Sequence, residues 1–438
     1  MRKCFYALTA TAIGMGWCGW LGAAPVKVEG KSEPVAKLIS QEGTLFARTM
    51  FGQPWKTIPA KGTVNPGDLL FGLPGATVQS RNDGVSLTLL ADLDRNSPYP
   101  ILEAAVTLHD SPGFDLDFTL DRGRVDVRNV KKSGAARVRI RFHNQTWEAT
   151  LNEPGTRIAL ELYGRWPKGV PFTPKPGPKD VPAADLVFLV LEGHVDLMHG
   201  AVQHAMSAPP GPALLHWDNM AQEDESPEKL DELPAWANKN ESTSERAQMV
   251  RKVIEDFRSE VVKTSLPKAA ETFASSEDQT HRALGVIVMA ATDDAGGLYK
   301  VFTETKYPDT WDRAVVVLRN WLGRGSGQDQ FLYRRLIEVR KLPPARAETI
   351  LQLLHSFGDE DLAHPEVYRI LVKYLDNEAL AIRGLAHWHL VRLVPEGKNI
   401  EFNPLAPKEE RDKGRDKWEK LVEAMLAKGE LPRKTTQK

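Results

Sequence analysis

Apolar and polar residues alternate in short runs through the first half of the chain. Residues 136–142, 145–151 and 156–162 each place apolar side chains at every second position. Because successive side chains of a strand point to opposite faces, these runs predict strands with one buried face. Turn residues such as those at 152–155 separate the runs. Strands at this spacing predict an antiparallel β-sandwich or jelly roll.

A short phrase recurs three times in this half: a charged residue, a glycine and then alternating residues. Its glycines are Gly43, Gly123 and Gly193, and they follow Glu, Arg and Glu respectively. A glycine here predicts a backbone position that a Cβ would crowd, such as a β-bulge or a sheet corner. The charge changes sign between copies while the glycine and the alternation are kept. The phrase therefore predicts a structural bend rather than a chemical site.

After residue 240 the apolar residues follow a helical period. Ser244 stands among N-cap residues, and Met249, Val253 and Phe257 then share one helix face. Further helices are predicted at 278–292, 309–323, 327–341, 344–357, 364–376, 378–394 and 407–428. Their connectors are short and contain Pro or Gly, and helix hairpins in series predict an α-solenoid.

The N-terminus has the layout of a secretory signal peptide, with a basic start, an apolar stretch and small residues over 1–24. A cut after Ala24 would place Pro25 next to the scissile bond, and a cut after Ala23 would place Leu21 at the −3 position. An uncleaved anchor is therefore the alternative. We expect export to the periplasm or the outside, with membrane attachment only if the segment is uncleaved.

The expected organisation is a β-domain followed by a helical domain, and 438 residues are enough for both. A tether at 25–34 leads to the β-domain at 35–219, with a division into 35–95 and 101–219 left open. An acidic linker at 220–240 leads to the helical domain at 241–438, which ends in a basic tail.

The first β segments resemble a known family. The pattern Gly-x-Leu-x-Ala at 43–47 is followed by Trp55, by Gly-x-Val-x-x-Gly-Asp-x-Leu at 62–70 and by Asp-Gly at 83–84. In this order over residues 35–90 the pattern resembles the periplasmic module of FecR-type proteins. Those regulators carry a sigma-factor-contacting segment ahead of a membrane span. Only three residues precede the apolar stretch here, so sigma-factor regulation is not expected to carry over.

The helical half resembles a second family. Residues 375–386, with Asp376 before the helix and Arg383 and Ala386 on it, resemble the second-helix signature of HEAT repeats. A weaker echo lies at 309–315. In its overall organisation, with one module after the other, the chain resembles uncharacterised secreted bacterial proteins. The resemblance implies a non-enzymatic binding or scaffolding role in the cell envelope, with protein partners and no cofactor.

Charge and cysteine content narrow the chemistry. A net charge of −1 gives no reason to expect nucleic acid or an anionic membrane as a partner. Both cysteines, Cys4 and Cys18, fall in the N-terminal segment. A cleaved protein would then contain no disulfide, cysteine-ligated zinc or cysteine nucleophile.

Three histidines, His194, His199 and His204, are spaced five apart. Strand residues five apart face opposite sides, so no metal site is predicted there. Asp115, Asp117 and Asp121 could form a calcium site or the acid/base pair of an unrecognised hydrolase. A solvated strand face is the favoured interpretation. No catalytic, cofactor-binding or metal-ligating residue is predicted.

Trp147 and Trp166 are the candidate ligand-binding residues. An exposed indole on a β-domain can stack on the apolar face of a sugar ring, so a glycan-binding protein is an alternative to scaffolding. A place in the hydrophobic core is the competing interpretation for both residues.

Overall fold

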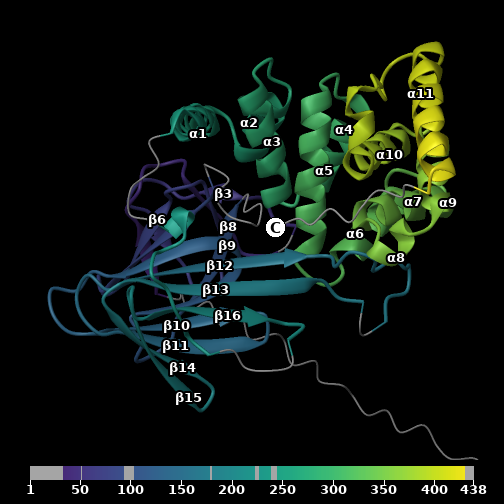
Figure 1. Cartoon of the computed structure of the whole chain (residues 1–438). Helices are drawn as coiled ribbons and strands as arrows, with labels where there is room; N and C mark the ends of the chain where they lie inside the picture. Colours follow the sequence, from purple (N-terminus) through teal and green to yellow (C-terminus); the bar gives the residue numbers. More distant parts are fainter. Residues whose placement is uncertain are drawn as a thin grey trace, which may run out of the picture. The chain divides into compact units, whose positions relative to one another are not determined.

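The computed structural model describes residues 33–50, 52–92, 103–177, 180–221, 226–237 and 244–429. The predicted signal peptide or anchor at 1–24 and most of the tether lie outside the described residues. Residues Pro34–Lys438 belong to one compact unit, in which a mostly antiparallel strand region precedes a helical region (Figure 1). None of the helices in the described ranges has the length and apolarity required to span a lipid bilayer.

Strands occupy the first half of the unit. They are β1 (Ala36–Leu38), β2 (Leu45–Arg48), β3 (Lys56–Thr57), β4 (Thr63–Val64), β5 (Leu69–Gly72), β6 (Thr77–Ser80), β7 (Val85–Leu90), β8 (Ala104–His109), β9 (Leu116–Asn129), β10 (Ala136–Phe142), β11 (Gln145–Leu151), β12 (Arg157–Arg165), β13 (Ala183–Glu192), β14 (His194–His199), β15 (Val202–Ser207), β16 (Pro212–Asp218) and β17 (Glu228–Lys229).

The strands pair in two sets that share β9. Sheet A runs in the order β4-β1-β6-β7-β9-β12-β13-β16-β17. Sheet B runs in the order β3-β2-β5-β8-β9-β10-β11-β14-β15, with β9 and β10 parallel and the other pairs antiparallel. Buried side chains of both sheets form one apolar cluster, to which Val125 contributes from sheet A and Phe118 from sheet B. The chain segments before and after residue 100 thus contribute strands to the same two sheets.

The three recurring glycines lie where the chain passes between the sheets. Gly43 separates β1 of sheet A from β2 of sheet B, and Gly193 separates β13 of sheet A from β14 of sheet B. Gly123 lies inside β9, which pairs in sheet B up to Arg122 and in sheet A from Gly123 onward. All three have positive φ, between 77° and 82°. Glycine adopts this conformation without the steric cost that a Cβ brings, which confirms the predicted sheet corner.

Helices fill the second half. They are α1 (Glu245–Lys263), α2 (Leu266–Ala274), α3 (Gln279–Ala291), α4 (Ala295–Glu304), α5 (Pro308–Gly323), α6 (Gln328–Glu338), α7 (Pro344–His355), α8 (Asp359–Leu362), α9 (Pro365–Tyr374), α10 (Leu380–Leu393) and α11 (Lys408–Ala427), with the 3-10 helices η1 (Ala235–Ala237) and η2 (Pro395–Asn399). The Ser244 side chain accepts a hydrogen bond from the Ala247 N–H, as an N-cap does. The predicted helical stretches correspond to α3, α5, α6, α7, α9, α10 and α11.

Three helices, α2, α4 and α8, were not predicted. Helix α2 has only nine residues and α8 only four, too few for a helical period to stand out. Helix α4 carries Gly296 and Gly297 in its first turn, and glycine has low helix propensity. The Asp294 side chain offsets this by accepting a hydrogen bond from the Gly297 N–H at 2.8 Å.

Two arginines, far apart in the sequence, bond in the same way to the connector that precedes their helix. Arg282 of α3 donates to the carbonyls five and six residues before it, in Glu277 and Ser276. Arg383 of α10 donates to the carbonyls at the same two offsets. Arg282 also forms a bidentate ion pair with Asp309 at the start of α5, at 2.8 Å. The same local geometry therefore recurs in two helix pairs.

The described part of the predicted acidic linker packs on sheet A. Strand β17 pairs with β16, and Leu230, Leu233 and Trp236 pack against a small apolar cluster on β12 and β13. The Arg124 guanidinium lies over the Trp236 ring, 4.0 Å from its centroid. Residues 222–225 and 238–240 lie outside the described residues.

Candidate functional site at the junction of strands and helices

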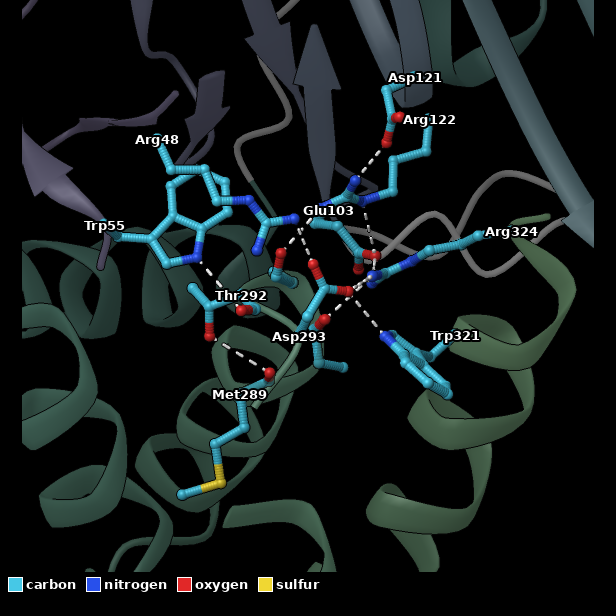
Figure 2. A network of polar contacts seen from close by, with 12 residues as sticks. Arg48, Trp55, Glu103, Asp121, Arg122, Met289, Thr292, Asp293, Trp321 and Arg324 are labelled. Atoms are coloured by element: carbon cyan, nitrogen blue, oxygen red, sulfur yellow. Dashed lines mark hydrogen bonds and ion pairs between the residues drawn. The ribbon is translucent and has the colours of Figure 1, made fainter. Parts of the chain in front are cut away.

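The corner of β9 faces the turn that joins α3 to α4. The Arg122 guanidinium reaches across and donates to the Ala291 carbonyl at 2.7 Å (Figure 2). On the strand side it pairs with Asp121 and lies 3.5 Å from a carboxylate oxygen of Glu103. Arg122, the residue before Gly123, thus connects the strand region to the helical region.

Asp293, in the same turn between α3 and α4, supplies a second buried carboxylate, in addition to Glu103, to the contacts between the two regions. It has a φ of 60°, and its carboxylate lies 2.5 Å from the Arg48 guanidinium of β2. The Trp321 indole of α5 donates to it at 2.9 Å, and Arg324 lies 3.5 Å away. Next to it, the Trp55 indole donates to the Thr292 carbonyl at 3.1 Å. The turn between α3 and α4 therefore contacts side chains from both regions (Figure 2).

Arg324, directly after α5, completes the network. It donates to Glu103 and, at 2.9 Å, to the Ala290 carbonyl. Burial, together with repulsion from Arg48, lowers the pKa of Arg324 to about 9. Its guanidinium is therefore still charged at neutral pH.

We call Arg48, Glu103, Arg122, Asp293 and Arg324 the ionic junction. No side chain among the five is more than 9% exposed. Withdrawing such charges from water costs free energy that their pairing roughly offsets, so the gain lies more in specificity than in stability. The network orients the two regions, and removal of one partner would leave another charge buried.

A cavity of about 20 Å³ adjoins the ionic junction. Its lining includes Glu103, Arg122, His143, Tyr163, Asn320 and Arg324. On the lining residues Glu103, Arg122 and Arg324, the buried atoms Oε2, Nε and Nε respectively have no hydrogen-bond partner among the described residues. The recurring phrase at Gly123, predicted to be only a structural bend, thus also lines a polar cavity.

A second contact brings the backbones of the two regions together through glycines. A Cβ placed on Gly323 would lie 2.6 Å from the Gly164 carbonyl oxygen. A Cβ placed on Gly358 would lie 2.7 Å from the Gly169 Cα. Both distances are shorter than any real Cβ contact. The two backbone segments therefore meet at each pair only because glycine has no side chain. We call these two pairs the glycine junction.

Trp166 belongs to the glycine junction. Its indole donates to the Leu322 carbonyl at 3.1 Å, and its ring packs on the His355 ring with centroids 4.5 Å apart. The His355 ring is 1% exposed, with Nδ1 3.2 Å from the Val170 carbonyl and Nε2 3.6 Å from Asp329. Burial lowers the pKa of His355, although the Val170 carbonyl and Asp329 oppose this. Trp166, one of the two predicted ligand-binding residues, therefore holds the loop after β12 against the helices.

Trp147, the other predicted ligand-binding residue, lies in the core of the strand region. It is 1% exposed, and its ring meets Phe142 edge to face with centroids 4.9 Å apart. The indole therefore has no open face on which a sugar ring could stack. Trp166 is partly buried and packs on His355, so of the two candidates only Trp147 is fully withdrawn from a ligand.

The three aspartates proposed for acid/base chemistry have separate partners. Asp115 pairs with Lys131 at 2.8 Å, and Asp121 pairs with Arg122 at the junction. Asp117 does not lie on a solvated face as expected: its side chain is 0% exposed. Arg141, on the adjacent strand β10, covers it and donates twice at 2.8 Å. The cavity that Asp121 lines does not include Asp115 or Asp117 among its lining residues.

The charge of Asp117 follows from these contacts. Burial alone would raise its pKa, but hydrogen bonds from Arg141 and Ser111 outweigh this and hold the pKa below its ordinary value. Asp117 is therefore an ionised partner of Arg141 at neutral pH, and its bonds bind β9 to β10.

Of the three histidines spaced five apart, His194 and His199 have separate partners. His194 Nδ1 lies 2.9 Å from Glu153, and His199 Nε2 lies 3.0 Å from Gln145. Within the described ranges no set of three or more His, Cys, Asp or Glu side chains is arranged to hold a metal ion.

The residues of the ionic junction gave almost no signal in the sequence. Arg324 lies in the segment 323–327, which reads as a helix connector, and Arg48 ends a predicted strand. Asp293 follows a predicted helix, a position that suggests only a turn. Their common feature is an interaction between positions more than 200 residues apart, as in the pair Arg48–Asp293.

No family model, curated protein or solved structure matches this chain. The likeness to FecR-type and HEAT modules therefore rests on the motifs alone.

Proposed function

We propose that this protein is a non-enzymatic binding or scaffolding protein of the bacterial cell envelope, with another envelope protein as its partner. The observation that carries the proposal is the double junction of the two regions. Five buried charges and two glycine contacts hold the strands and helices in one arrangement. Such a unit presents both regions as a single fixed surface, which suits partner binding because little order is lost on association.

We also propose the finer folds that this role implies: a FecR-like β-sandwich and a HEAT-like solenoid. The sheet-changing glycines and the shared core support the first assignment, and the recurring bonds of Arg282 and Arg383 to their preceding connectors support the second. Repeated helix pairs typically offer extended surfaces to proteins.

A pull-down from envelope fractions of the source organism tests the proposal. The bait is the whole chain, because the helical region shares its junctions with the strands. A Gly323→Ala bait, which disturbs the glycine junction, is expected to capture less partner than wild type. A Gly325→Ala bait should capture as much, since a Cβ there has nothing within 4 Å. Failure of the wild-type chain to enrich any protein over an unrelated exported bait would contradict the proposal.

A further inference from the structure

The edges of the two sheets differ in length. Sheet A ends in β4 and β17, and sheet B ends on one side in β3, and each of these edge strands has only two residues. The other edge of sheet B is β15, with six residues. Among the described residues β15 forms a ladder with β14 alone, and it lies beyond β14 at the end of the sheet (Figure 1). Sheet B therefore has one long edge strand with a neighbour on one side only.

The free side of β15 carries backbone groups of Gln203 and Ala205. The Ala208 N–H, directly after the strand, donates to the Gly193 carbonyl, directly before β14, at 3.0 Å. Along a strand of an antiparallel ladder, successive residues direct their N–H and C=O groups to opposite sides. Residues at even offsets from Ala208 therefore pair toward β14, and Gln203 and Ala205, at odd offsets, point away from it. Both residues are exposed, so their N–H and C=O groups are open to a further strand.

The side chains of β15 do not protect this edge. Native proteins commonly block an open edge with charged residues, proline or a β-bulge. The strand Val202–Ser207 contains no Lys, Arg, Asp, Glu or Pro, and its register with β14 is regular. Val202 is also 48% exposed, although it is a large apolar residue. An added strand would occupy the free backbone groups and reduce the exposure of Val202.

We propose that β15 pairs antiparallel with β15 of a second copy of this chain, so that sheet B continues across a two-fold axis. A two-fold axis brings the same strand of both copies together, so both open edges are used at once and the assembly closes as a dimer. Like charges opposite each other destabilise a strand pair, and two copies of Val202–Ser207 place no Lys, Arg, Asp or Glu across the axis. Dimerisation is independent of the proposed envelope partner, and its failure would leave the scaffolding proposal intact.

The mass of the whole chain in solution tests this pairing. Sedimentation velocity over about a hundredfold range of concentration should show a monomer–dimer equilibrium. Ala205→Pro removes an N–H that points away from β14, a position where an edge strand tolerates proline, so the ladder with β14 is kept. Two symmetry-related donors are lost, and dimerisation should weaken by about tenfold or more. Ala205→Thr keeps the N–H and suits a strand, so this matched control should dimerise as the wild type does.

Hydrogen exchange of the wild-type chain tests the pairing even if Ala205→Pro fails to fold. Exchange of the backbone amides in residues 202–207 should slow as the protein concentration rises, because the added strand protects Gln203 and Ala205. A wild-type chain that stays monomeric at every concentration would overturn the proposal. A dimer that Ala205→Pro leaves unchanged, or one in which exchange at 202–207 does not depend on concentration, would overturn it as well.

Discussion

The two junctions join the same regions by opposite means. At the ionic junction, long side chains such as Arg48 and Arg122 cross a gap between the backbones and meet Asp293 or a main-chain carbonyl. At the glycine junction there is no gap, and the Gly164 and Gly323 backbones touch directly. The ionic junction depends on charges that must each keep a partner. The glycine junction depends on the absence of a single carbon atom.

This difference determines how each junction can fail. Loss of one charge at the ionic junction leaves its former partner buried without a counter-charge, and this costs stability whichever of the two was removed. An added methyl group at the glycine junction pushes two backbones apart, and neighbouring contacts of Trp166 and His355 can absorb part of the shift. Charge substitutions should therefore be more damaging than added methyl groups, except where a glycine also sets the course of a strand.

Gly123→Ala should have the largest effect, because Gly123 sets the strand corner that carries Arg122. Its φ is 82°, and a Cβ would lie 2.0 Å from the Glu103 carbonyl oxygen. We expect the variant to lose more than about 4 kcal/mol of stability or to remain unfolded, as judged by urea denaturation followed by circular dichroism. Gly134→Ala is the matched control, with a φ of 81° and nothing within 4 Å, and should cost about 1–2 kcal/mol. Equal losses of stability in the two variants would show that the positive φ, and not the close approach of Glu103, accounts for the effect.

Asp293→Asn should have the next largest effect. The substitution leaves Arg48 and Arg324 buried beside a neutral amide, and we expect a loss of about 3–5 kcal/mol in the free energy of unfolding. Asn tolerates the φ of 60° at this position, so the backbone is not the cause. Asp83→Asn is the control: Asp83 has a φ of 56° but is 59% exposed in its pair with Lys37, and should lose less than about 1 kcal/mol. A similar loss in both variants would contradict a special role for the buried pair.

Gly323→Ala probes the other junction and should lose about 1–3 kcal/mol, the usual cost of an overpacked contact. Its Cβ would lie 2.6 Å from the Arg165 Cα, so β12 and α5 must separate. Limited proteolysis measures this as faster cleavage near the loop after β12. Gly325→Ala, two residues further on and in open space, should be cleaved at the wild-type rate. Unchanged proteolysis of Gly323→Ala would show that the contact is not needed to hold the loop.

The sequence predicts local features of this molecule well. The alternation of residues 136–142 is enough to place β10, and the glycine of the recurring phrase predicts a corner because only its backbone allows one. The helical period likewise places most helices. Each of these signals lies within a few residues of the feature that it predicts.

The candidate site could not be predicted in this way. Arg48, Asp293 and Arg324 look like ordinary turn or surface residues until the fold brings them together. Gly123 was correctly interpreted as a bend, yet the same bend aims Arg122 at the helices and forms part of the cavity wall. Trp147 shows the converse, since a tryptophan on an alternating strand fits a binding face or a core equally well, and only the packing of Phe142 decides.

His355→Gln should have the smallest effect on stability. It tests whether the glycine junction, unlike the ionic junction, weakens as the pH falls. Burial keeps folded His355 neutral, so its pKa lies below the unfolded value of 6.5. As the pH falls below 6.5 the unfolded chain takes up a proton that the folded chain does not, and stability declines until the folded pKa is passed, by about 1.4 kcal/mol per pH unit at most. Gln carries no titratable proton, so the variant should lose this part of the decline when the free energy of unfolding is measured between pH 7 and pH 5. Exposed His364→Gln controls for removal of one ionisable group, and identical pH slopes in both variants would show that His355 does not make the glycine junction sensitive to acid.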